Sequence, residues 1–138
     1  MDFKIVNDLL IRSTDKTRFN KGNDYYQNGY VEEIKYTNEE RVLSIEGKVL
    51  SESSSATYNS SIVLDLQDKN IDFVNCDCVD FIKRSKNEDM PICKHIVAIT
   101  LYVENLLKSD VISNLKQKTL VVKNKNKAKR SKTEEKTK

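Results

Sequence analysis

The sequence is poor in glycine, proline and histidine, and it contains no tryptophan. Its glycines are Gly22, Gly29 and Gly47, so the two glycine-rich phosphate-binding patterns, G-x-x-x-x-G-K-[S/T] and G-x-G-x-x-G, do not occur. The longest apolar run, 96–103 with Thr100 inside it, is far shorter than the roughly 20 residues that span a bilayer. These absences exclude the glycine-rich nucleotide-binding loops and predict a soluble protein.

The three cysteines and the single histidine all lie within one short stretch of the chain. Cys76 and Cys78 form one pair, and Cys93 and His95 form a second pair after fourteen intervening residues. Three thiolates and one imidazole are a donor set that a structural Zn²⁺ takes in tetrahedral geometry. The pattern therefore predicts a closed zinc site, with no coordination position for a substrate.

Other chemistries use the same residue types. A disulfide needs an oxidising compartment, and residues 1–12 lack the features of a secretory signal, so we expect a cytoplasmic protein with reduced thiols. A nucleophilic pair of Cys93 and His95 leaves the first two cysteines unexplained. Inert core thiols have no reason to occur in two close pairs, whereas an iron–sulfur cluster stays open on ligand type alone.

The apolar periodicity predicts an antiparallel α+β domain. We expect the N-terminal helix to be capped by Asp2 and the second helix to end before Gly29, which suits a left-handed position. A small sheet of about four strands should follow. The expected helices are 2–12 and 15–28, and the expected strands are 30–36, 41–50, 57–66 and 71–75, with turns at 38–40, 51–55 and 67–70.

The zinc site should link the last strand to a following helix. Residues two apart on a regular strand point to opposite faces, so the chain must bend at Asp77 for Cys76 and Cys78 to reach one metal. Pro91 suits a helix start, and apolar residues from Ile92 to Leu106 recur at helical spacing. We therefore expect Cys93 and His95 in the first turn of that helix, where the helix dipole stabilises thiolates.

The ligand pattern Cys-x-Cys followed by Cys-x-His resembles the SWIM zinc finger. The segment 22–31, which contains Tyr25 and Tyr26, is similar to the opening of bacterial SWIM domains attached to Swi/Snf-type ATPases, and the resemblance covers about 16–108. It implies a zinc-stabilised binding module. The connection between the ligand pairs, 79–92, is longer and more charged than in many bacterial members.

Charge divides the chain in two. Residues 116–138 carry ten basic and two acidic residues, a net charge of +8, whereas residues 1–115 carry −5. We expect one zinc-binding domain at 1–115 and a disordered basic tail at 116–138, whose one apolar patch is 120–122. Tyr25 and Tyr26 are interpreted as packing residues rather than as a stacking platform for bases.

Function follows from these features as two hypotheses. The first is DNA contact with little sequence specificity, and the candidate residues are Lys83, Arg84, Lys86, Lys94, Lys123, Lys125, Lys127, Lys129 and Arg130. The second is a protein-interaction module that docks onto a Swi/Snf-type ATPase or a recombination partner. The pattern shows no acid and base pair, so we expect neither an enzyme nor a small-molecule substrate.

Overall fold

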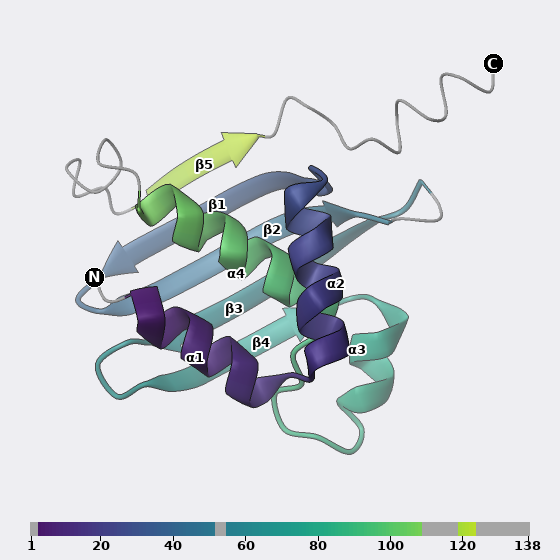
Figure 1. The fold of residues 1–138 in the computed structure, drawn as a ribbon, viewed down its shortest axis with the longest axis horizontal. Helices are drawn as coiled ribbons and strands as arrows, with labels where there is room; N and C mark the ends of the chain where they lie inside the picture. Colours follow the sequence, from purple (N-terminus) through teal and green to yellow (C-terminus); the bar gives the residue numbers. More distant parts are fainter. Residues whose placement is uncertain (1–2, 52–54, 109–118, 124–138) are drawn as a thin grey trace.

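The computed structural model describes residues 3–51, 55–108 and 119–123. Within these ranges the chain folds as an α+β domain in which helices cover one face of an antiparallel sheet (Figure 1). The helices are α1 (Phe3–Ser13), α2 (Lys16–Gln27), α3 (Val79–Arg84) and α4 (Lys94–Leu107). The strands are β1 (Val31–Glu39), β2 (Val42–Leu50), β3 (Thr57–Asp65), β4 (Asn70–Cys76) and β5 (Thr119–Lys123), and they lie in the order β4-β3-β2-β1-β5.

Local sequence signals set both ends of α2. Asp15 is the N-cap, and its side chain accepts a hydrogen bond from the Arg18 amide. At the other end Gly29 has a φ of 79°, and the amides of Gly29 and Tyr30 donate to the carbonyls of Tyr26 and Tyr25. This is a Schellman motif, so the prediction that Gly29 ends the second helix is confirmed.

The sheet has one buried face and one open face. On β2, Leu43, Ile45 and Val49 are buried, whereas Glu46 and Lys48 point to the other side. The first hairpin turns at Glu40 and Arg41, which have φ values of 50° and 71°. A two-residue turn with both residues in the left-handed region matches the twist of the flanking strands. β1 therefore runs three residues further than the strand predicted at 30–36.

Helix α4 lies at the centre of the core. It contacts β1, β2, β3 and β4 on one side and α1 and α2 on the other. Ile96, Ile99 and Val103 are fully buried, as the helical periodicity predicts. Gly47 of β2 lies under this helix, because a Cβ there would be 2.6 Å from Cγ2 of Ile99.

Two expectations differ from the structure. Thr119–Lys123 forms β5 and pairs with β1, so this part of the segment predicted to be a disordered tail belongs to the sheet. The backbone of β5 pairs with the edge of β1, which would otherwise be open. The predicted connection at 79–92 contains helix α3. Asp2 and residues 124–138 lie outside the described residues.

Strand β4 departs from simple alternation. Val63 pairs with Phe73 but Leu64 pairs with Ile71, so Asp72 is an extra residue in a β-bulge. The bulge reverses the faces, which leaves Phe73 51% exposed while Val74 and Cys76 are buried. No helix among the described residues is long and apolar enough to cross a membrane.

Candidate metal centre

Four donor atoms meet between the end of β4, the start of α3 and the start of α4. The Sγ atoms of Cys76, Cys78 and Cys93 and a ring nitrogen of His95 all lie within 4.8 Å of one another, and all four residues are buried. Nδ1 of His95 is 3.8 Å from Sγ of Cys76 and 4.0 Å from Sγ of Cys93. The two predicted ligand pairs are thus brought together by the fold.

The bend between the first two cysteines is held by the neighbouring strand. β4 ends at Cys76, and Cys78 is the N-cap of α3, where its Sγ accepts a hydrogen bond from the Phe81 amide at 3.3 Å. Asp77 accepts a hydrogen bond from the backbone amide of Asn59 at 3.0 Å. This contact turns the chain at the residue expected from the sequence, so both sulfurs point inward.

The second ligand pair is placed by the start of α4. Cys93 is the N-cap of this helix and His95 lies in its first turn. The preceding carbonyl of Ile92 accepts hydrogen bonds from the Thr14 hydroxyl at 2.8 Å and from Arg84 at 3.0 Å. The entry to the helix is therefore fixed by the residue that follows α1 on one side and by α3 on the other.

Aromatic rings surround the histidine. The ring of His95 lies 4.7 Å from the ring of Tyr58 and 5.4 Å from that of Tyr25, measured between centroids. Its Nε2 is buried without a hydrogen-bond partner among the described residues, whereas Nδ1 faces the sulfurs. Nδ1 is therefore the nitrogen that would bind a metal. Tyr25 is 3% exposed, which agrees with its interpretation as a packing residue.

The segment 22–31, which resembles the opening of SWIM domains, packs directly against α4 at Gly22. A Cβ at Gly22 would lie 2.4 Å from Cβ of Val97 and 2.7 Å from the carbonyl oxygen of Lys94. Nζ of Lys94 lies over the Tyr25 ring, 5.5 Å from its centroid. Helices α2 and α4 therefore approach closely where the second ligand pair begins.

The three thiols shift one another's pKa values through the hydrogen bonds between them. Hydrogen bonds from Cys76 and Cys93 hold the pKa of Cys78 far below its ordinary value, and the Phe81 amide adds to this effect. The hydrogen bond with Cys78, together with burial, raises the pKa of Cys76 to about 11. Hydrogen bonds to the other two sulfurs, together with burial, raise the pKa of Cys93 well above its ordinary value. A cation at this centre would replace the shared protons.

A salt-bridge network lies beside the cluster. Arg18 of α2 donates to both carboxylate oxygens of Asp80 at 2.7 and 2.8 Å and also pairs with Asp15. Arg84 donates to both oxygens of Glu88 at 3.0 and 3.1 Å and lies 3.7 Å from Asp80. The Arg84 side chain is only 14% exposed. The donors of Arg84 are thus used in contacts within the domain, which leaves little of this side chain for binding phosphate.

The other predicted nucleic-acid contacts are scattered. Lys83 and Lys86 are exposed on and after α3, and neither forms an ion pair with the described residues. Lys94 lies against Tyr25 and is half-buried. Lys123 ends β5, and the structure describes its backbone pairing with Glu33 only. The remaining candidates, Lys125, Lys127, Lys129 and Arg130, lie outside the described residues.

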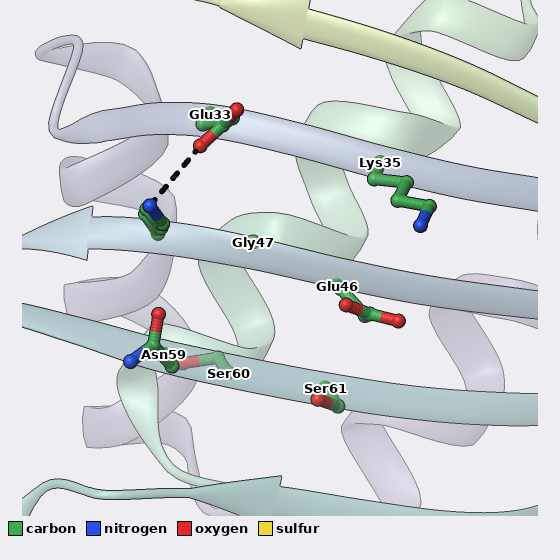
Figure 2. A pocket seen from close by; sticks show the side chains of 8 residues that line it. Glu33, Lys35, Glu46, Gly47, Asn59, Ser60 and Ser61 are labelled. Atoms are coloured by element: carbon green, nitrogen blue, oxygen red, sulfur yellow. Dashed lines mark ion pairs between the residues drawn. The ribbon is translucent and has the colours of Figure 1, made fainter.

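A shallow hollow of about 230 Å³ lies on the open face of the sheet (Figure 2). Glu33, Lys35 and Glu46 line it together with Lys48 and Ser61, and an ion pair of 3.4 Å joins Lys48 to Glu33. None of the four clustered residues lines this hollow. Its mixed charges compensate one another and identify no ligand.

Sequence reasoning missed several residues that support the cluster. Ser60 contacts the sulfur of Cys76, and Arg18 contacts Asp80 of α3. Both are distant from the cluster in the sequence, and only strand register and helix packing bring them close to it. Helix α3 could have been predicted from the sequence, because Phe81 is an apolar residue shortly after Cys78 and Asp80 suits a first helical turn.

The donor set fits a tetrahedral metal ion. For bonds of about 2.3 Å to sulfur and 2.0–2.1 Å to nitrogen, neighbouring donors lie roughly 3.6–3.8 Å apart, and the observed sulfur to nitrogen distances of 3.8 and 4.0 Å are close to this.

Comparison of the chain with protein-family models, with curated proteins and with solved structures finds no match. The SWIM resemblance therefore rests on the ligand pattern and the upstream segment.

Proposed function

We propose that this chain is a SWIM-type binding module stabilised by one Zn²⁺. The observation that carries the proposal is the meeting of Cys76, Cys78, Cys93 and His95, with their donor atoms within 4.8 Å in a buried position. Zinc is favoured over other metals because it takes mixed thiolate and imidazole ligands in tetrahedral sites. Four strong ligands leave no position for water, so the role proposed is binding rather than catalysis.

Native mass spectrometry of protein purified without added metal tests the zinc site. The expected result is one zinc ion per chain in the wild type and none in the His95→Ala and Cys93→Ser variants. Ser61→Ala, which leaves all four ligands in place and lies on the open face of the sheet, serves as a matched control. A folded wild type that retains no metal would contradict the proposal, and a coloured protein would indicate an iron–sulfur cluster.

We further propose that the module contacts DNA with little sequence specificity. Two features support this: Lys83 and Lys86 are exposed beside the cluster, and residues 116–138 carry a net charge of +8. Such contacts attract phosphates without reading bases. If about five charges pair with phosphates, the affinity falls about 500-fold between 50 and 200 mM salt, at a slope near −0.9 per contact.

Gel shifts with zinc-loaded full-length protein test this proposal. Duplex and single-stranded DNA should bind at low salt, and a K83Q/K86Q variant should lower both the affinity and the salt slope. K35Q is the matched control, because Lys35 is exposed on the open face of the sheet. Failure of the wild type to bind either duplex or single-stranded DNA at 50 mM salt would contradict the proposal.

A protein-docking role is the second candidate, and the surface of α3 favours it. Val79 and Ile82 are 64% and 49% exposed and lie one helical turn apart. Exposed aliphatic residues side by side are typical of protein contacts rather than of phosphate contacts. A pull-down with a Swi/Snf-type ATPase should succeed with the wild type and fail with V79S/I82S. Unchanged retention by that variant would exclude this surface.

A further inference from the structure

The strand register places one hydroxyl against one of the clustered sulfurs. Ser60 of β3 is paired directly with Cys76 of β4, so the two side chains point to the same face of the sheet. Oγ of Ser60 lies 3.1 Å from Sγ of Cys76. Ser60 is 1% exposed and Cys76 is 3% exposed, which keeps water away from this contact.

The direction of this hydrogen bond follows from proton counting. A metal-bound cysteine is a thiolate and has no proton to give. The hydroxyl of Ser60 must then be the donor, with the sulfur of Cys76 as the acceptor. A buried hydroxyl needs a partner, and the structure shows no other hydrogen bond of this hydroxyl among the described residues.

The three sulfurs differ in the hydrogen bonds that they accept. Cys78 accepts a hydrogen bond from the backbone amide of Phe81, which no side-chain substitution removes. Cys93 contacts His95 and its fellow cysteines, and no hydroxyl or amide donor to its sulfur is seen in the described part of the chain. Cys76 is therefore the sulfur whose hydrogen bond depends on a side chain outside the ligand set.

We propose that Ser60 is a positioning residue of the metal centre, which orients the Cys76 thiolate through its hydroxyl proton and withdraws negative charge from it. This inference rests on the proposed zinc site. Three thiolates on one divalent ion leave a net charge of about −1, which a hydrogen-bond donor partly offsets. Residues that orient metal ligands in this way typically contribute about 10-fold or more to metal affinity.

The test compares three full-length variants with the wild type. Ser60→Ala removes the hydroxyl, and Ser60→Thr keeps it. Ser61→Ala is the matched control, because Ser61 is the next residue on β3 and lies on the opposite face (Figure 2). Zinc affinity is measured by competition with a chromophoric chelator. The electronic state of the sulfurs is measured from the thiolate-to-metal charge-transfer bands of the Co²⁺-loaded proteins.

We expect Ser60→Ala to bind zinc about 10-fold more weakly and to shift the charge-transfer bands to longer wavelength, because a thiolate without its hydrogen bond donates electrons more readily. Ser60→Thr and Ser61→Ala should resemble the wild type. Weaker binding with unmoved bands would make Ser60 a packing residue and overturn the inference. Unchanged affinity would do the same, while a wild type that binds neither metal would overturn the proposed function itself.

Discussion

Arg18 of α2 forms a two-pronged salt bridge with Asp80 of α3, with nitrogen to oxygen distances of 2.7 and 2.8 Å. The two residues are 62 positions apart, so this contact connects the helix that precedes the sheet to the helix that Cys78 caps. The guanidinium lowers the pKa of the Asp80 carboxyl below its usual range. Helix α3 is thus attached to α2 by a charged contact, in addition to its connection with the cysteine cluster through Cys78.

A double-mutant cycle on this pair should give a coupling energy of about 0.5–1 kcal/mol. The value is modest because both side chains are about one-third exposed, where water screens their attraction. Urea unfolding of zinc-loaded R18Q, D80N and the double variant at pH 7 measures it. Additive effects of the two single substitutions would show that the salt bridge contributes nothing to stability.

Metal affinity should fall steeply as the pH decreases. Cys76 and Cys93 have raised pKa values and keep their protons in the metal-free fold, whereas Cys78 is already ionised. Binding at pH 7 should therefore release about two protons per metal ion from a preformed site. Titration calorimetry in buffers of different ionisation enthalpy counts them. Release of about three protons would instead indicate that the metal-free chain has ordinary thiols and no preformed site.

Gly22→Ala should destabilise the domain by about 2 kcal/mol and weaken zinc binding. The added Cβ would lie 2.4 Å from Val97 and 2.7 Å from the Lys94 carbonyl, so α4 must move where it presents His95. Thermal unfolding and chelator competition measure the two effects. Gly29→Ala is the control: its φ of 79° makes the substitution costly, by about 1 kcal/mol, but zinc affinity should stay unchanged. Equal zinc affinity for G22A and the wild type would contradict the packing argument.

Glu104→Gln should stabilise the protein at neutral pH. Burial raises the pKa of the Glu104 carboxyl, which accepts a hydrogen bond of 3.0 Å from Asn7. Because the folded-state pKa is above the unfolded value of 4.5, the wild type is stabilised below pH 4.5 and loses that contribution as the pH rises through the folded-state pKa. The glutamine keeps an acceptor oxygen without the charge.

The advantage of the Glu104→Gln variant over the wild type should therefore shrink as the pH is lowered from 7 toward 5. Urea unfolding of the two zinc-loaded proteins at several pH values measures this difference, and the zinc contribution cancels in the comparison. Asn7→Ala, which removes the donor, should raise the pKa of Glu104 further. A constant difference between the two proteins across this pH range would show that Glu104 does not titrate as described.

The sequence by itself determined the local elements and the donor set. The spacing of Ile96, Ile99 and Val103 specified α4, Asp15 and Gly29 specified the ends of α2, and the two ligand pairs specified which residues gather. Each of these signals lies within a few residues of the structure it produces, because capping, helical periodicity and metal-ligand spacing act over one or two turns of chain.

Only the tertiary structure decided what lies around the donor set. The bulge at Asp72 placed Phe73 outside and Cys76 inside, and the same register set Ser60 opposite Cys76. Arg84 was predicted to contact DNA, yet it is held by Glu88, Asp80 and the Ile92 carbonyl. The pairing of β5 with β1 likewise joins distant segments. Strand register, edge pairing and salt bridges between distant residues depend on which segments meet, and no local pattern in the sequence records that choice.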